Sequence, residues 1–516
     1  MLSEYLQIGV DYVWGSWLVV LLIITGIYLT IRLKLPQFTS FYHAVEIVRG
    51  KFDKKDDPGE ITHFQALSAA LSATVGLGNI AGVAIAISVG GPGAIVWMWL
   101  IGFIGMATKA ASCTLAVKYR HFLPSGKVLG GPMHYIEMGL GKKWKPVAVF
   151  FAASVAIASF GGGNMFQANQ VAAALSDNYD LPREITGIIL SVSVALVIIG
   201  GIKRIGRVAS KLVPFMTIIY IAGAVIVIVM HYAEIPSAIS LIFHDAFTGK
   251  AAAGGAVGEV IRQGVRRGTF SNESGLGSAP IAHAAAQTKE PVREGLVGLL
   301  EPFIDTIVVC SMTALVIIFS SAYLPAGKVL TVSNTDKKVE VSLAEKVYIK
   351  KDDKLIIKKK NTTLAEILIQ EIKYDERKAV GTIISSASIN IKPGDPISFG
   401  NGVRLTTAAF DSVLKGFGSY FVSIAVFLFA FSTMLSWSYY GEEGTEYLFG
   451  EKGVMPYRIL FILAIFIGSI WSINPVMNFS DIAYGLMAVP NVIALWFLSG
   501  EISADHRAYF QKIKKV

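Results

Sequence analysis

The stretch Ser271-Asn272-Glu273-Ser274-Gly275-Leu276-Gly277-Ser278 lies within a long apolar region, yet it carries a carboxylate, an amide, hydroxyls and two glycines. Lipid offers the backbone no hydrogen-bond partner, so a helix that breaks here must line protein or a water-filled cavity. A second stretch, Ser72-Ala73-Thr74-Val75-Gly76-Leu77-Gly78-Asn79, matches the first at Ser72, Gly76, Leu77 and Gly78 when shifted by about 199 positions. Glycine-interrupted apolar segments at matching positions of two halves are typical of a membrane transporter's binding site at the bilayer midplane.

The composition indicates that the whole chain is a membrane protein. Of its 516 residues, 53% are hydrophobic and only 16% are charged, whereas soluble domains carry about 25% charged residues. The net charge of +9 does not indicate nucleic-acid binding, because the Lys and Arg residues gather between apolar runs, where they orient a membrane protein. We therefore expect a multi-pass protein of the cell membrane, surrounded by the lipid bilayer. Cys113 and Cys310 lie in apolar segments, which favours buried free thiols over a disulfide or a metal pair.

About eleven runs are apolar and long enough to span a bilayer: 14–32, 64–87, 91–117, 146–175, 184–200, 206–231, 252–287, 295–322, 411–438, 457–473 and 479–499. The first run has no basic region before it and no cleavage site after it, which indicates a retained helix rather than a signal peptide. Basic residues concentrate in 33–63, 118–145, 203–207 and the C-terminal tail with Lys512, Lys514 and Lys515. All of these segments are cytoplasmic if the N-terminus is outside and the C-terminus inside.

Residues 323–404 interrupt the apolar pattern with many charged residues. Alternating runs such as Val339-Glu340-Val341-Ser342-Leu343 and Ser388-Ile389-Asn390-Ile391-Lys392 predict strands. Thr363-Leu364-Ala365-Glu366 predicts the start of one helix, and Pro393-Gly394-Asp395-Pro396 predicts a turn. We expect a small, mostly β insertion on the outer face, where long loops are translocated whatever their charge; the alternative is a disordered loop.

Several longer motifs follow one another along the apolar regions: Gly90-Gly91-Pro92-Gly93-Ala94 with Trp97-Met98-Trp99, Gly105-Met106-Ala107-Thr108-Lys109, Gly130-Gly131-Pro132-Met133, Arg267 to Glu273, Leu428 to Thr433, and Trp437 to Glu442. In this order they resemble the alanine or glycine:cation symporter family, the sodium:alanine symporters. The resemblance implies an all-α polytopic protein of the leucine-transporter fold, with two inverted five-helix repeats after one extra N-terminal helix. The expected parts are 1–63 (extra helix and cytoplasmic loop), 64–231 and 252–499 (repeats, the second interrupted by 323–404) and 500–516 (cytoplasmic tail).

Two features depart from the family pattern. The family usually has a glutamate three residues after the lysine that corresponds to Lys109, and Ser112 stands there in this chain. A charge pair inside the membrane is then missing, or Lys109 has another partner. The insertion is also unusual for the family, so the resemblance implies nothing about it.

The first break supplies candidate groups for a substrate carboxylate and a cation. An unwound 74–79 segment presents backbone N–H groups at a half-helix N-terminus, and such an end binds a carboxylate. Gly76 and Gly78 are candidate substrate contacts in this reading; the alternative is that the glycines only allow close packing. Thr74 and Asn79 add neutral oxygens, which suit Na⁺.

The second break contains Glu273, and an ionised side chain in mid-membrane is normally paired or functional. It is a candidate for attracting a substrate ammonium group; the alternative is a structural pair with Lys109 or Arg266. Asp305 has either a structural or a cation-linked role. The resemblance implies that Phe270, Ser271 and Asn272 contact substrate.

Three further positions complete the candidate site. Gln167 lies in a polar interruption of the fourth span and either binds substrate or links helices. The leucine-transporter-like fold implies that Ser432 and Thr433 join carbonyls of the first broken helix around Na⁺, with Thr433 also near substrate. Trp437, one turn later, then limits substrate size; the alternative is an aromatic anchor at the membrane interface.

The expected activity is Na⁺-coupled import of a small neutral amino acid, alanine or glycine, by alternating access. Two alternatives remain: proton coupling through Glu273, and an amino-acid sensor that binds its ligand in the insertion. An enzyme is not expected, because the sequence shows no metal-ligand cluster and no nucleophile–base motif.

Overall fold

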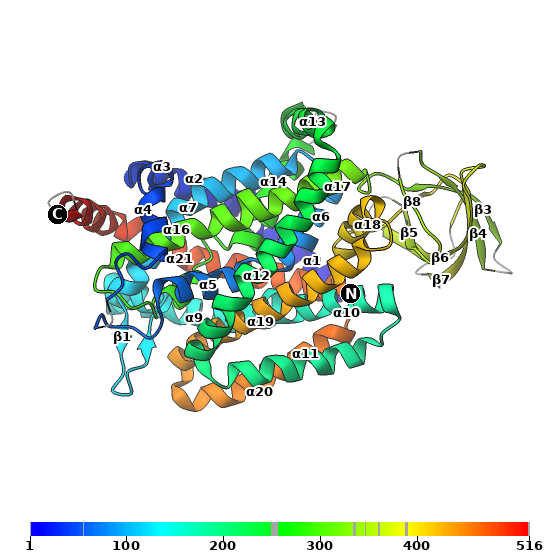
Figure 1. Cartoon of the computed structure of the whole chain (residues 1–516). Helices are drawn as coiled ribbons and strands as arrows, with labels where there is room; N and C mark the ends of the chain where they lie inside the picture. The colour runs from blue at the N-terminus through cyan, green and yellow to red at the C-terminus, as the bar shows by residue number, and fades with distance from the viewer. Residues whose placement is uncertain are drawn as a thin grey trace.

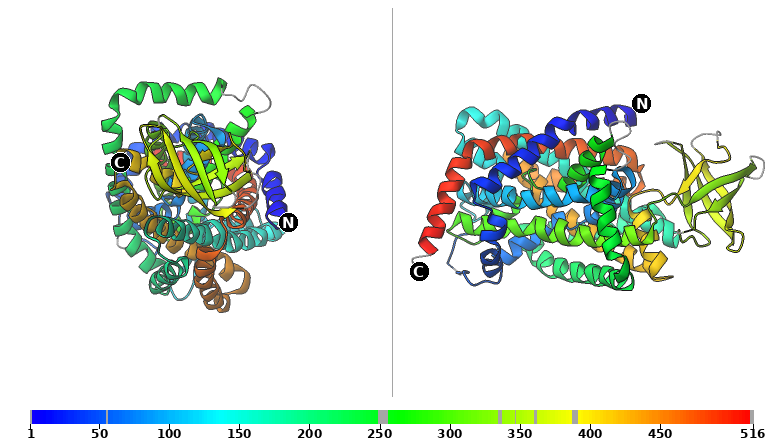
Figure 2. Two further views of the ribbon diagram at one scale, coloured as in Figure 1. Left: turned by 90° about the vertical axis from the view of Figure 1, so that its right-hand side faces the viewer. Right: turned by 90° about the horizontal axis from the view of Figure 1, so that it is seen from above.

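The computed structural model describes residues 2–54, 56–248, 256–333, 337–345, 347–359, 362–386 and 391–513. A long helical body carries a small β-barrel at one end (Figure 1). The chain starts at the barrel end, and the last helix finishes at the opposite end (Figure 2). The elements α4 and β1, which belong to the basic segments 33–63 and 118–145, also lie at that opposite end.

The N-terminal half of the body is helical apart from one short hairpin. Its elements are α1 Leu2–Val13, α2 Ser16–Arg32, α3 Pro36–Thr39, α4 Phe41–Val48, α5 His63–Thr74, η1 Gly78–Gly82, α6 Val83–Gly90, α7 Ala94–Lys118, β1 His121–Phe122, β2 Val128–Leu129, α8 Pro132–Gly139, η2 Lys142–Trp144, α9 Lys145–Phe160, η3 Gly161–Met165, α10 Phe166–Tyr179, α11 Arg183–Ile198, α12 Gly201–Met230, η4 Tyr232–Glu234 and α13 Ile235–Thr248.

The C-terminal half contains the barrel strands between two groups of helices. Its elements are α14 Ala256–Asn272, α15 Ala279–His283, α16 Pro291–Pro302, η6 Phe303–Cys310, α17 Ser311–Ser320, β3 Gly327–Ser333, β4 Lys338–Leu343, β5 Lys354–Lys359, β6 Thr362–Lys373, β7 Lys378–Ser386, β8 Pro396–Ser398, α18 Val403–Val413, α19 Gly418–Phe449, η7 Glu451–Gly453, α20 Val454–Ile470 and α21 Ile473–Ile513.

Within the described residues, eight helices are long and apolar enough to cross a membrane, or up to nine if one bent pair counts as a single span. These nine correspond to nine of the eleven predicted runs. The other two runs correspond to α11, which has only 16 residues, and to the broken segment α14–α15, the beginning of which (252–255) lies outside the described residues. The count of eleven therefore stays a prediction.

Two broken segments form the centre of the body. Every residue from 66 to 87 is buried, and so is every residue from 263 to 286. In the first segment, the helices on either side of the break meet at an angle of 47°. The two breaks touch, because a Cβ built on Gly78 would lie only 2.9 Å from the Cα of Ser271. Only glycine allows this approach.

The matching residues of the two breaks adopt different backbones. The second break is a left-handed turn, with positive φ angles at Glu273 (56°), Gly275 (88°) and Gly277 (86°). The first break instead continues through Leu77 into η1, a π-helical turn. Left-handed φ angles cost little at glycine and more at other residues, so the strained residue of the second turn is Glu273.

The insertion is a closed six-stranded barrel with the strand order β3-β4-β7-β6-β5-β8. The strand predicted at Val339–Leu343 is confirmed as part of β4, and 393–394 form the predicted turn. Of the predicted strand 388–392, residues 388–390 lie outside the described residues. A disordered loop is therefore the wrong alternative for the described part of the insertion.

The helix predicted to start at Thr363 is wrong, because 362–373 form β6. Leu364, Ala365, Ile367 and Ile369 are buried, and β6 pairs with β5 on one side and β7 on the other. Such pairing between distant segments overrides a local capping pattern.

The barrel should be removable without unfolding the helical body. Gly327 and Ile397 are register partners of β3 and β8, so a short Gly/Ser linker can replace residues 328–396. Because each ion pair between the two parts has at least one partly exposed partner, we expect the unfolding midpoint in detergent to change by less than about 4 °C. Intrinsic fluorescence reports on the body alone, because residues 323–404 contain no tryptophan. Aggregation of the shortened chain would contradict the prediction.

Candidate functional site

The first break is held open by side-chain amides. The N–H of Gly76 donates to Oδ1 of Asn79 (2.8 Å), and the N–H of Leu77 donates to Oε1 of Gln167 (3.3 Å). Nε2 of Gln167 donates to the carbonyl of Gly162 (2.7 Å), so Gln167 both links helices and lies at the predicted carboxylate site. The N–H groups predicted to receive a carboxylate thus meet neutral amide oxygens, and the long bond from Leu77 is the easier to exchange.

Thr433 on α19 faces this break. A Cβ added to Gly76 would lie 2.2 Å from Oγ1 of Thr433. This buried oxygen has no hydrogen-bond partner in the described part of the chain. A buried hydroxyl is normally hydrogen-bonded, and an exception calls for an explanation such as a ligand.

The other candidates for Na⁺ binding have partners. Ser432 donates to Phe429 O (2.9 Å), and its own carbonyl accepts from Ser72 Oγ (2.6 Å). Thr74 Oγ1 donates one turn back to Ala70 O (3.3 Å). The amide nitrogen of Asn79 donates to the carboxylate of Asp305. The Na⁺ assignment of these four residues stays a prediction.

Glu273 takes part in neither of the ion pairs considered for it. One of its oxygens accepts from Nε1 of Trp437 (2.8 Å), and the other accepts from Ser278. Lys109 and Arg266 instead bind other carboxylates. Among the described residues, neither predicted ion pair of Glu273 is formed, and the hydrogen bonds to its carboxylate come from neutral donors; its role in binding stays a prediction.

Aromatic rings wall the same region. Trp437 stacks on Tyr484, with ring centres 4.8 Å apart. Phe270 lies 4.9 Å from Tyr484 and 5.4 Å from Phe166. Gly163 makes room for Trp437, since a Cβ there would approach the indole to 2.2 Å. Trp437 has an exposed fraction of 0%, which excludes its alternative role as an interfacial anchor.

Asp305 on η6 joins the two breaks. It accepts hydrogen bonds from Asn79 Nδ2 (2.6 Å), Ser271 Oγ (2.9 Å) and Thr306 Oγ1 (2.7 Å). Thr306 in turn accepts from Nδ2 of Asn272 (2.9 Å). No cation contacts Asp305 within the described residues. The sequence named Asp305 as an intramembrane carboxylate but could not show that both breaks converge on it.

The comparisons with known proteins identify the family. The model of the sodium:alanine symporter family matches residues 1–349 and 380–516. The chain belongs to this family. It is 40% identical over 507 residues to the sodium/alanine symporter AgcS of Methanococcus maripaludis (98% of this chain, 96% of the relative), and 32% identical over 516 residues to a probable sodium/glutamine symporter, GlnT, of Bacillus subtilis (100% and 92%).

A solved structure supports the fold. The crystal structure of MhsT in complex with L-phenylalanine matches with a TM-score of 0.54 at 15% identity, over 87% of this chain and 92% of that one. The expected leucine-transporter-like fold is thereby confirmed. The family model leaves out 350–379, which lie inside the insertion.

The structure shows which group pairs with Lys109 in this member of the sodium:alanine symporter family, which has Ser112 where the family usually has a glutamate. Lys109 pairs with Glu301 on α16 (2.8 Å), while Ser112 donates to the carbonyl of Lys109 (3.1 Å). Glu301 also accepts from Nε2 of His283 (2.7 Å). Lys109 therefore has another partner, supplied by a residue 192 positions away.

A chain of buried ionisable groups continues from there toward the end of the body opposite the barrel. The other ring nitrogen of His283 contacts Glu294 (2.5 Å), and Glu294 also contacts His63. His63 begins α5 and His283 ends α15, so Glu294 ties one half of each broken segment to α16. The sequence analysis missed this network. The intramembrane position of Glu294 and the two histidines is the signal that could have revealed it.

Among the described residues, Cys113, His283 and Glu301 form a group whose ligand atoms could reach one metal ion. They lie far apart in the sequence, so ligand spacing could not reveal them. Lys109 and Glu294 already bind the same His283–Glu301 pair, which does not favour a metal there. Cys113 and Cys310 are free and buried, as predicted.

Near the C-terminal end of α14, one to two turns before the second break, Arg266 and Arg267 both contact one oxygen of Asp481 on α21, at 2.6 Å for Arg267. Arg262 pairs with Glu259 (2.6 Å) nearer the surface. Two of these three arginines are therefore buried in an ion-pair cluster, and the third is partly exposed. Asp481 lies in the last predicted span and was missed.

The close approach at Gly76 can be tested with a matched pair of variants. Gly76→Ala forces the new Cβ against Thr433 and should destabilise the protein by about 1–3 kcal/mol. In Gly82→Ala the nearest atom to the Cβ is 3.9 Å away, so the midpoint should stay the same or rise. Thermal unfolding in detergent measures both, and equal midpoints would contradict the geometry.

Proposed function

We propose that this protein imports a small neutral amino acid, alanine or glycine, together with Na⁺. Cation-coupled amino-acid transport is the activity of the family to which the chain belongs. The observation that supports a binding site at this place is the unpartnered Thr433 hydroxyl facing Gly76, between two broken segments that are buried throughout. The same region contains N–H donors for a substrate carboxylate and a wall of aromatic rings. It also contains the carboxylate of Glu273, which pairs with no cation among the described residues.

Each group has a proposed role. The substrate carboxylate takes the N–H groups at Gly76–Gly78, with Gln167 moving to donate to it, because a half-helix end and an amide both favour an anion. The substrate ammonium group faces Glu273 across the second break, where Ser271 and Asn272 add polar contacts. Trp437 and Phe270 limit the length of the substrate side chain, since an extra methylene changes discrimination by about 1–3 kcal/mol.

The oxygen of Thr433, together with backbone carbonyls of the 74–76 segment, is the proposed Na⁺ site. Neutral oxygens suit a hard cation. Asn79 and Ser432 are proposed to shape this site through their hydrogen bonds, and Thr74 is proposed as a further oxygen donor.

Alternating access requires both ends of the site to open in turn. We propose that the contacts of Glu294 with His63 and His283 close the inner end, and that the contacts of Arg266 and Arg267 with Asp481 close the outer end. At the inner end, Arg120 donates to the carbonyls of Ala284, Ala286, Pro58 and Thr288 at 2.6–2.8 Å. Each cluster joins a broken segment to an unbroken helix, so breaking one cluster frees one half of that segment.

The proposed orientation places the barrel and the N-terminus outside and the C-terminus in the cytoplasm. Lys203, in the first turn of α12, lies 3.8 Å from Glu60 of the 33–63 segment, so two of the basic segments share one end. Eleven spans, counting α11 and α14–α15, and two inverted repeats at 64–231 and 252–499 complete this proposal.

Proton coupling is the second candidate. It is favoured by two buried carboxylates, Glu273 and Asp305, whose hydrogen-bond partners are neutral. A relative that is 36% identical over 471 residues (90% of this chain, 84% of the relative) is named a putative sodium/proton-dependent alanine carrier, YrbD of Bacillus subtilis.

Uptake of labelled alanine into proteoliposomes should require Na⁺ and survive collapse of the pH gradient. Thr433→Val removes the unpartnered oxygen at nearly constant volume, so the Na⁺ concentration for half-maximal uptake should rise about tenfold or more. Thr445→Val is the matched control, because Oγ1 of Thr445 only donates to Gly441 O within α19 (2.8 Å). Uptake driven by a proton gradient without Na⁺ would reject this proposal and favour proton coupling.

Glu273→Gln should leave the unfolding midpoint without ligand nearly unchanged. The glutamine oxygen still accepts from Trp437, and its amide donates to Ser278 once that hydroxyl rotates. The midpoint shift caused by alanine should disappear, because a charge-assisted contact is about twice as strong as a neutral one.

Glu301→Gln is the control with the same chemical change. It strands the buried Lys109 ammonium group and should lower the midpoint without ligand by the equivalent of about 3–5 kcal/mol. If Glu273→Gln lowered that midpoint as much while alanine still raised it, the binding role of Glu273 would be wrong.

A further inference from the structure

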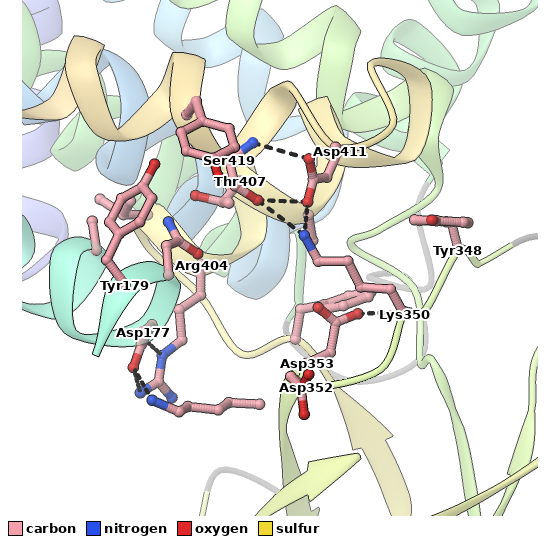
Figure 3. A pocket seen from close by; sticks show the side chains of 18 of the residues that line it. Asp177, Tyr179, Tyr348, Lys350, Asp352, Asp353, Arg404, Thr407, Asp411 and Ser419 are labelled. Atoms are coloured by element: carbon pink, nitrogen blue, oxygen red, sulfur yellow. Dashed lines mark hydrogen bonds and ion pairs between the residues drawn. The ribbon is translucent and has the colours of Figure 1, made fainter. Parts of the chain in front are cut away.

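A cavity of about 330 Å³ lies where the barrel meets the helical body. Its walls come from the end of α10, the segment 348–354 that leads into β5, α18, and the first residues of α19 (Figure 3). We call it the junction pocket. Tyr179, Lys351, Asp352 and Tyr420 at its edge are exposed, so the junction pocket opens to solvent. Its size suits a molecule as small as an amino acid.

Most charges around the junction pocket neutralise one another. Lys350 contacts Asp411, which is buried. Arg404 contacts Asp177 and also Glu366 (2.8 Å), and Lys354 lies 3.3 Å from Asp177. These pairs join the barrel to α10 and α18 and form fixed walls (Figure 3).

Asp353 is the exception. One of its oxygens accepts from the backbone N–H of Lys350 (2.8 Å), and no cation forms an ion pair with it in the part of the chain that the structure describes. Burial raises the pKa of Asp353 to about 7. Asp353 is half-buried, and a partly desolvated carboxylate without a counter-ion is less favourable than one in water, so a bound cationic group would lower that cost.

The aromatic residues of the junction pocket also suit a cationic group. Tyr179 and Tyr420 lie with ring centres 5.4 Å apart on one side, and Tyr348 lies on another. The ammonium group of Lys415 already lies 5.5 Å from the centre of the Tyr348 ring. Ammonium groups are attracted to aromatic faces at such distances.

We propose that the junction pocket is a second binding site for a small amino acid, separate from the transport site. The ammonium group binds Asp353 beside the tyrosines, and the carboxylate faces Lys351, which has no ion pair among the described residues. The choice of an amino acid rests on the proposed function, while the requirement for an ammonium group rests on Asp353 alone.

The junction pocket is connected to the first break through α18. The N–H of Val403 donates to Oε1 of Gln170 (3.3 Å), and Oγ1 of Thr406 donates to the carbonyl of Ile80 in η1 (3.1 Å). Arg404, Thr407 and Asp411 on the same helix line the junction pocket. A ligand that bridges the barrel and α18 therefore holds α18 against the broken segment and stabilises this closed arrangement of the outer end.

Hydrogen exchange on the full-length protein can locate such a ligand. The experiment uses the Glu273→Gln variant, so that ligand binding at the proposed transport site does not contribute to the protection. The probes are L-alanine, ethylamine and propionate. We expect L-alanine to slow exchange in 347–354 and 403–411 in this background. Ethylamine should protect these segments less, and propionate should not protect them.

Asp353→Asn should abolish this protection, while the asparagine oxygen still accepts from Lys350 and keeps the turn. Asp375→Asn is the matched control. Asp375 is an exposed carboxylate in the β6–β7 turn, outside the junction pocket, so this variant should keep the protection.

The pH dependence supplies an independent readout. Because the ammonium group binds the ionised carboxylate, the affinity for L-alanine in calorimetry should rise about tenfold from pH 6 to pH 8 as Asp353 loses its proton. Lys350, Asp352 and Asp411 are the charged groups that act on Asp353. Asp353→Asn should remove this dependence.

No protection at the junction pocket by any ammonium-bearing probe, or protection that persists in Asp353→Asn, would overturn the proposal. Protection by ethylamine equal to that by L-alanine would reject the amino acid in favour of a simple amine. If uptake of alanine fails but Asp353-dependent protection is present, the proposed function is wrong while the junction pocket stands.

Discussion

A backbone N–H or C=O inside a bilayer must find a partner within the protein, and the two breaks depend on this constraint. Amide side chains satisfy it. Asn79 and Gln167 accept the N–H groups of the first break. At the second break, Oδ1 of Asn272 accepts the N–H of Ser274 (2.9 Å), and Nδ2 of Asn491 donates to the carbonyl of Gly275 (2.8 Å). Because an amide carries both a donor and an acceptor, it can stabilise an unwound turn and still exchange one bond with a ligand.

Buried charges then connect the unwound turns to the rest of the body. An unpaired charge in a low-dielectric interior is far more costly than a paired one, so each charged cluster fixes the elements that meet at it. Glu294 fixes α5 and α15 to α16, Asp481 fixes α14 to α21, and Asp305 fixes the two breaks to each other. Clusters of this kind are either fully formed or broken. This property suits the alternation that we propose, in which one end of the site is closed while the other is open.

Charged groups also connect the barrel to the helical body. Ion pairs connect the barrel to α10 and α18, and α18 lies between the barrel and the first break. A change at the barrel therefore has a route through one helix to the first break. Figure 1 shows the barrel at one end of the body, so any such influence acts on that end.

The sequence by itself determined the membrane class, the family, the position of both breaks, the strand at 339–343 and the residues gathered around Gly76, Glu273 and Trp437. These follow from composition, apolar run length and local motifs, which are properties of neighbouring residues. The sequence could not determine that Thr363 begins no helix, that Lys109 pairs with Glu301, or that Asp305 receives bonds from both breaks.

Only the tertiary structure decided those points, because each depends on groups that are distant in the chain. β6 is a strand because β5 and β7 pair with its two edges. The matching glycines of the two breaks take different backbones because different neighbours surround them: Ser271 stands against Gly78, whereas Pro132 and Asn491 stand against its counterpart Gly277. Local residue types specify where a helix can break; the packing of remote helices specifies what shape the break takes and which side chain faces it.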